Sequence, residues 1–198
     1  PATITMDGAK TVTATFTQDQ HTLTVRVTAS SDDAEERASG SMYLSSTDLE
    51  LVYDGGNQTV GMRFNGVGIP QGATIVNAYV QFQVDAPNSV ATSLTVEGED
   101  VDDAPTFTYA GGNISSRART TAAVSWSPVP WTTRGEAGPE QRTPNVASVV
   151  QEIVSRPGWS SGNSVVIIVT GSGERVAESY NGDQDGAPLL HLEYSTGS

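Results

Sequence analysis

The sequence predicts an all-β fold, an antiparallel β-sandwich of the jelly-roll type with one short capping α-helix around residues 144–156. Three observations support this prediction. Apolar residues recur at every second position in eight segments, Gly-, Asn-, Asp- and Pro-rich turns separate these segments, and a single stretch has helical spacing. Because alternating residues point to opposite faces of a strand, the pattern suits two sheets packed face to face.

The strands are expected at residues 22–28, 42–52, 58–65, 74–84, 92–99, 122–126, 165–170 and 189–194. The segment 74–84 has the clearest alternation, with Val80 and Phe82 on the apolar face and Tyr79 on the polar face. An Asp-Gly-Gly-Asn turn at residues 54–57 separates two of the strands.

One helix is expected among these strands. Thr143 is a good N-cap and Pro144 suits the first helical position. An apolar stripe at spacings of three and four residues follows, at Val146, Val149, Val150, Ile153 and Val154. Pro157 and the glycine after it end the helix, which we expect to cover one end of the sandwich.

The chain divides into two parts. Residues 1–24 read as the last hairpin of a preceding repeat plus a linker, because two alternating segments flank the Asp7-Gly8 turn signal. This hairpin resembles the end of extracellular bacterial repeats of the internalin type. The β-sandwich binding module then comprises residues 25–198. The alternative is that residues 1–24 form a short N-terminal strand pair of this main domain. Since the sequence begins with proline, we expect it to come from a longer polypeptide.

Composition excludes several classes of function. The 198 residues contain no Cys, which excludes disulfides and thiolate sites, and 23 acidic against 10 basic residues give a net charge of −13. Such a charge repels nucleic acid and anionic membranes, and no segment reaches the ~18 consecutive apolar residues of a membrane span. The absence of Cys and the many Thr, Ser, Gly and acidic residues favour an extracellular location.

Several landmarks resemble one bacterial family. The most distinctive are Arg63-Phe64 and the segment Ile69-Pro70-Gln71-Gly72-Ala73, followed at a distance by a Ser-Trp segment at 125–126. In this order, over about residues 25–196, they resemble the DNRLRE-type domains. The resemblance implies an extracellular jelly-roll module attached to polysaccharide-degrading enzymes or large surface proteins, and several such modules bind carbohydrate. The motif that gives the family its name is not present as such.

An acidic run is the candidate metal site. Four carboxylates occur within five residues, and a further pair shares one face of a later strand. Calcium takes about 6–8 oxygen ligands, so this density of oxygen donors suits it. The expected calcium ligands are Asp32, Asp33, Glu35, Glu36, Asp48 and Glu50. The alternative is an acidic, solvated surface.

Sugar sites need an exposed aromatic ring beside planar hydrogen-bonding groups. Tyr79 stands among three amides, and the segment 173–180 is dense in polar groups. The candidate ligand-binding residues are Asn77, Tyr79, Gln81, Gln83, Trp131, Arg175, Glu178 and Tyr180. The alternatives are core packing for Trp131 and an internal ion pair between Arg175 and Glu178. Tyr43, Tyr53 and Tyr109 also lie near loops.

The function expected from these observations is that of a carbohydrate-binding module without catalytic activity. It would attach tethered catalytic or surface domains of a secreted or surface bacterial protein to a polysaccharide, with structural calcium. The alternative is a structural or adhesive module that has no sugar site. The carboxylates do not have the spacing of a catalytic pair, so an enzyme is not expected. Because of the charge and the short apolar segments, binding to nucleic acid and insertion into a membrane are not expected either.

Overall fold

The computed structural model describes residue 8 and residues 19–197. In this part of the chain, α1 (Ala147–Val154) and the 3-10 helix η1 (Pro139–Gln141) accompany twelve strands, all paired antiparallel. The strands are β1 (Asp19–Arg26), β2 (Asp33–Arg37), β3 (Met42–Tyr43), β4 (Asp48–Glu50), β5 (Gln58–Phe64), β6 (Thr74–Gln81), β7 (Val84–Ala86), β8 (Ser93–Gly98), β9 (Val124–Trp126), β10 (Val165–Ser172), β11 (Val176–Glu178) and β12 (Leu189–Thr196). The predicted all-β sandwich with one short helix is confirmed.

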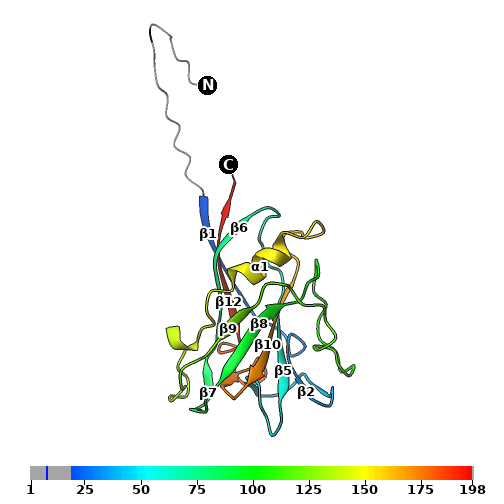
Figure 1. The fold of residues 1–198 in the computed structure, drawn as a ribbon, viewed down its shortest axis with the longest axis vertical. Helices are drawn as coiled ribbons and strands as arrows, with labels where there is room; N and C mark the ends of the chain where they lie inside the picture. The colour runs from blue at the N-terminus through cyan, green and yellow to red at the C-terminus, as the bar shows by residue number, and fades with distance from the viewer. Residues whose placement is uncertain (1–7, 9–18, 198) are drawn as a thin grey trace.

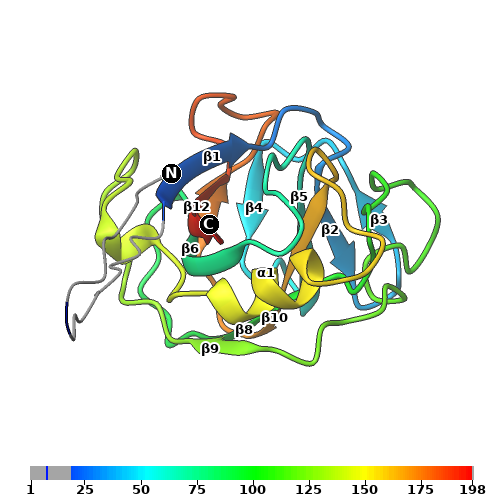
Figure 2. The ribbon, with the colours of Figure 1, turned by 90° about the horizontal axis from the view of Figure 1, so that it is seen from above.

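Two layers enclose the core (Figures 1 and 2). One layer is a six-stranded sheet in the order β3-β2-β5-β10-β8-β9. The other combines two three-stranded sheets, β1-β12-β6 and β4-β11-β7. Only Phe82 and Gln83 separate β6 from β7, so the two smaller sheets lie end to end.

Apolar side chains fill the space between the layers. Val60, Met62 and Phe64 point inward from β5 and are fully buried. A second apolar cluster, which includes Phe107 and Ile168, lies under the loop of residues 99–120 on the outer face of the large sheet. Strand β10 is therefore covered on both faces, which explains its unbroken apolar sequence.

The helix begins later than expected. Its N-cap is Val146, whereas Thr143 follows the edge of β6. The Thr143 N–H donates to the Val80 carbonyl, and the Thr143 hydroxyl accepts from the Val80 N–H. This segment supplies partners to an otherwise unpaired sheet edge, and that requirement overrides the local capping signal. The predicted apolar stripe is confirmed, because Val149, Val150, Ile153 and Val154 are buried against the core.

Three strand predictions were wrong in detail. The expected strand at 42–52 is divided, because the chain leaves the six-stranded sheet after β3 and enters the other layer as β4. Strand β2 occupies the acidic run, and β11 lies in the polar segment that was expected to be a loop. In both cases hydrogen bonds to neighbouring strands outweigh an unfavourable composition.

The expected hairpin at residues 1–16 lies outside the described residues, apart from Gly8. Strand β1 pairs with β12 over its whole length, from Asp19 opposite Thr196 to Arg26 opposite Leu189, so the boundary expected after residue 24 falls within β1. The two ends of the described chain thus lie side by side at one end of the sandwich (Figure 1). Among the described helices, none has the length and apolar character needed to span a membrane.

Candidate functional site

The acidic run is divided between the two faces of β2. Asp32 and Glu36 face the 99–120 loop, where Arg63 and Thr106 donate to Asp32 and the backbone of Ile114 and Ser115 donates to Glu36. Asp33 and Glu35 face the opposite layer: the backbone N–H of Tyr180 donates to Asp33 at 2.7 Å. These carboxylates accept hydrogen bonds inside the fold, so they tie distant segments to β2.

The six expected calcium ligands therefore do not converge on one point. Of the described residues, no three or more acidic or histidine side chains form a group that could hold a metal ion. The closest approach is that of Glu35 and Glu50, whose carboxyl groups share a hydrogen bond, with Asp48 on the same face of β4. Among the described residues, only two of the six expected ligands thus share a hydrogen bond, and calcium binding stays a prediction without a complete set of ligands.

Glu35 is the most strongly perturbed of these acids. Burial and, less strongly, the neighbouring Glu50 carboxyl together raise its pKa to about 9. Its Oε1 accepts from the Glu50 backbone N–H and from Gln58 Nε2, both at 2.8 Å. Burial also raises the pKa of Asp33 to about 7. Protons are consequently bound to this part of the folded protein at neutral pH.

Replacing Glu35 with glutamine should flatten the pH dependence of stability. The folded state keeps the Glu35 proton up to about pH 9, whereas the unfolded chain releases it near its ordinary pKa of 4.5. The stability that the bound Glu35 proton gives the folded state is therefore complete below about pH 4.5. It is lost as the pH rises towards 9. The amide keeps both accepted hydrogen bonds and donates to Glu50, so Glu35→Gln should be more stable than the native protein at pH 9, by roughly 2 kcal/mol.

Denaturant unfolding between pH 5 and 9 measures this difference. Glu136→Gln, on an exposed loop, is the control and should follow the native curve. If Glu35→Gln loses stability with rising pH as steeply as the native protein does, the buried shared proton is not the cause.

The predicted polar face of β6 exists, but its groups bind one another. The Tyr79 ring stacks on His191 of β12 at 4.6 Å between centroids, and the Arg142 guanidinium lies 4.6 Å from the ring centroid on the side of the other strand edge. Asn77 donates to Glu193 at 3.2 Å, and Gln81 donates to the backbone carbonyls of Phe82 and Gly138. The half-buried Tyr79 ring is thus already engaged by His191 and Arg142, which leaves it a poor surface for a sugar.

Trp131 and Arg175 have structural positions that differ from the expected sugar contacts. Trp131 is 0% exposed, donates from Nε1 to the Glu140 carbonyl, and packs near Phe82 and Trp126. Arg175 is 1% exposed. Its guanidinium donates to the carbonyls of Val90, Pro128, Val129 and Glu174 and to the Thr92 hydroxyl. Neither side chain can reach a glycan on the surface of this fold. Tyr180 is half-buried against the core.

Glu178 lies in the wall of a hollow of about 460 Å³ beside β11, which Asp85, Arg134 and Asp183 also line. Burial and the hydrogen-bonded Asp85 raise the pKa of Glu178 to about 7, and Arg134 bonds Asp85 at 2.6 Å. Retaining glycosidases hold their two carboxyl groups ~5–5.5 Å apart to flank a sugar. Glu178 and Asp85 bond each other directly, so no sugar fits between them, and no aromatic ring lines this hollow. Gln83 lies beside it, 3.5 Å from Asp183.

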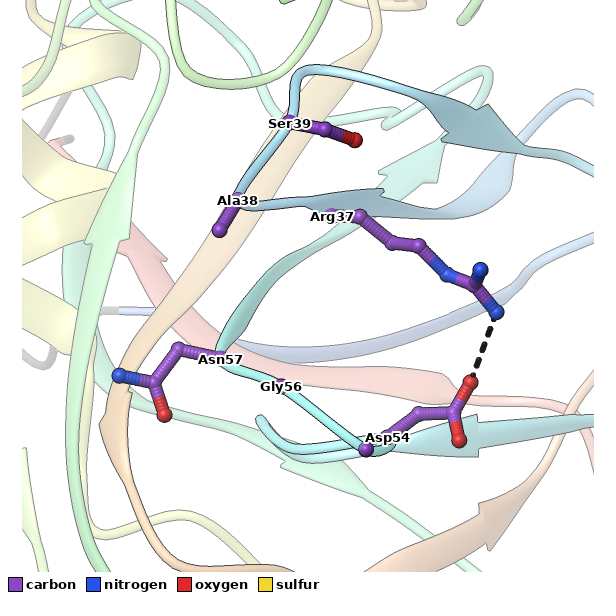
Figure 3. A pocket seen from close by; sticks show the side chains of 7 residues that line it. Arg37, Ala38, Ser39, Asp54, Gly56 and Asn57 are labelled. Carbon is purple, nitrogen blue, oxygen red and sulfur yellow. Dashed lines mark hydrogen bonds and ion pairs between the residues drawn. The ribbon is translucent and has the colours of Figure 1, made fainter.

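A groove at the loops offers a different arrangement (Figure 3). Its first hollow, of about 430 Å³, is lined by Arg37, Ala38, Ser39 and residues 54–57. Arg37 donates to Asp54 at 3.0 Å across this hollow, whereas the Asn57 side chain points away from this pair. A second hollow of about 310 Å³ adjoins it, since Arg37, Ala38 and Asn57 line both. We call these two hollows the loop groove.

Exposed tyrosines flank the loop groove. Tyr43 of β3 is 42% exposed, and the Arg37 guanidinium lies 4.3 Å from its ring centroid. Tyr53, also 42% exposed, directly precedes Asp54 and forms an isolated bridge with Asn57. An exposed aromatic ring, a guanidinium and a carboxylate therefore lie together beside the loop groove, a combination that suits sugar recognition.

Sequence reasoning did not select the loop groove. The sequence indicated the turn at 54–57 and the two tyrosines, but it did not single out Arg37, which is the last residue of β2. Only the pairing of β2 with β3 and β5 brings Arg37 to Tyr43 and to the 54–57 turn. The alternation of Asp33, Glu35 and Arg37 on one face was the available signal.

No family model matches the chain, and no curated protein matches it in sequence. The resemblance to the DNRLRE-type domains thus remains a prediction.

Proposed function

We propose that this protein is a non-catalytic carbohydrate-binding module that attaches a secreted or surface-bound bacterial polypeptide to a polysaccharide. The observation that carries this proposal is the loop groove, where the half-exposed Tyr43 ring contacts Arg37, which in turn pairs with Asp54 across the first hollow. A tyrosine face accepts the C–H face of a pyranose, and the planar polar groups bond its hydroxyls.

The position of the loop groove suits attachment. The cyan loop between β4 and β5, which lines the first hollow, lies at the end of the sandwich opposite the termini (Figure 1). Domains tethered at either end of the chain would therefore leave the groove free to meet a polymer. This arrangement favours a role in holding a partner domain on a polysaccharide.

Charge favours an uncharged glycan. The protein carries −13, and around the groove the carboxylates of Glu36 and Asp54 outnumber the single guanidinium of Arg37. A polyanionic chain would approach against this field, and binding of a neutral chain should change little with salt.

Affinity electrophoresis through gels that contain single polysaccharides tests the proposal. We expect retardation by at least one neutral polysaccharide, such as a glucan, xylan or mannan, and weaker retardation by alginate or sulfated galactan. If no polysaccharide retards the protein, the structural or adhesive role without a sugar site is favoured instead.

Calcium is a separate part of the proposal. Of its expected ligands only Glu35 and Glu50 meet, and a cation there would take the place of the shared proton. The electrophoresis and a thermal melt should be repeated with a chelator. A melting temperature that does not change would remove calcium from the account and leave the sugar site untouched.

A further inference from the structure

The loop groove crosses from one side of the β2 end to the other. Its first hollow lies on the side of Arg37 and Asp54, and its second on the side of Thr59, Ser115 and Gly171. At about 430 and 310 Å³, each is near the lower end of the ~300–1,000 Å³ typical of small-ligand sites. Each hollow alone is thus large enough for a short piece of a sugar chain.

The boundary between the hollows is formed by the residues that line both, Arg37, Ala38 and Asn57. It consists of the Ala38 backbone N–H, which donates to the Asn57 carbonyl at 3.2 Å, and of the exposed Ala38 methyl group. Of the other residues that line both hollows, Arg37 turns away to Asp54 and Tyr43, and the Asn57 amide lies on the Ala38 side, where it can bond a sugar hydroxyl. A chain that fills one hollow can therefore continue over Ala38 into the other.

Hydrogen-bonding groups are present on both sides of the bridge. The first hollow offers the Arg37 guanidinium, the Asp54 carboxylate and the Ser39 hydroxyl. The second offers the hydroxyls of Thr59, Ser115 and Thr170, of which Ser115 also bonds Glu36. The groups in each hollow can thus form hydrogen bonds with the hydroxyl groups of successive sugar residues.

We infer that the loop groove binds the interior of a linear polysaccharide at two adjoining subsites, one on each side of the Ala38–Asn57 bridge. This inference rests on the proposed function and deepens it, because it states which part of the polymer is held. Contacts on both sides of the bridge add only when one chain spans it, so affinity depends on chain length.

Calorimetry with cello-, xylo- and manno-oligosaccharides of two to six residues tests this. For the series whose polymer retards the native protein, affinity should rise by about tenfold or more from the disaccharide to the tetrasaccharide or longer. In Ala38→Phe, the ring obstructs the bridge. The longer oligosaccharides should then bind within about threefold of the disaccharide, whose affinity stays at the native level.

Ala91→Phe is the matched control, because Ala91 is an exposed alanine in the loop between β7 and β8 that lines neither hollow of the groove. It should keep the native dependence on length. If the native protein is retarded by a polymer but binds its disaccharide as tightly as its hexasaccharide, the two-subsite inference is overturned while the proposed function stands. If no polymer is retarded, both fail. The native length series alone decides the matter should Ala38→Phe not fold.

Discussion

Replacing Arg175 with alanine is expected to lower the free energy of unfolding by about 3–5 kcal/mol. The guanidinium is 1% exposed and supplies hydrogen bonds to loops on either side of it, at Val90, Thr92, Pro128 and Val129. Its removal leaves buried carbonyl groups without donors and an empty volume that water fills poorly. Urea unfolding monitored by circular dichroism measures the loss.

Two further variants separate this role from a simple loss of charge. Arg175→Lys should recover only part of the stability, since an ammonium cannot reach the carbonyls that Nε and both terminal nitrogens serve. Arg134→Ala removes an arginine whose side chain is 71% exposed and should cost less than about 1 kcal/mol. An Arg175→Ala protein as stable as Arg134→Ala would mean that the buried guanidinium does not brace these loops.

Tyr43→Ala should weaken binding to the retained polysaccharide by about ten- to a hundredfold, because the ring supplies the apolar face of the proposed site. The ring is 42% exposed at the edge of the large sheet, so its loss should leave the fold intact. Tyr43→Phe keeps the ring and should bind within a few-fold of the native protein. Affinity electrophoresis under the same conditions gives the affinities of the native protein, Tyr43→Ala and Tyr43→Phe.

Tyr109→Ala provides the matched control. Neither tyrosine is among the residues that line the two hollows, but Tyr43 contacts Arg37, which lines both. Tyr109 is 71% exposed in the 99–120 loop. Its variant should bind as the native protein does. If Tyr109→Ala loses binding and Tyr43→Ala keeps it, the sugar site lies elsewhere on the molecule.

The strands of the core were predictable because their alternation is local. Segments such as Thr74–Gln81 and Val165–Ser172 carry apolar residues at the spacing that the sheet requires, and the helix stripe does so for α1. The acidic strand β2 was not predictable in this way. Its carboxylates are stabilised by backbone donors far along the chain, among them Ile114 and Tyr180, and no local pattern reveals such partners.

The candidate site was less predictable than the fold. Which aromatic rings are exposed depends on what packs over them, and this reverses the ranking that the sequence suggested. Trp131 is covered by the core and Tyr79 by His191 and Arg142, whereas Tyr43 keeps much of its surface free. Polar residues in an apparent loop, Arg175 above all, proved to be internal braces because strand β11 draws them inside.

The central claim is that a polysaccharide binds in the loop groove, and mapping backbone amide chemical shifts during titration with an oligosaccharide of the retained polymer tests it most directly. The account predicts the largest shifts at Arg37–Ser39, at residues 54–57 and at Thr59 and Gly171. Shifts confined to Asn77, Tyr79 and His191 on the face of β6 and β12, or saturation with no shift around Arg37, would contradict it.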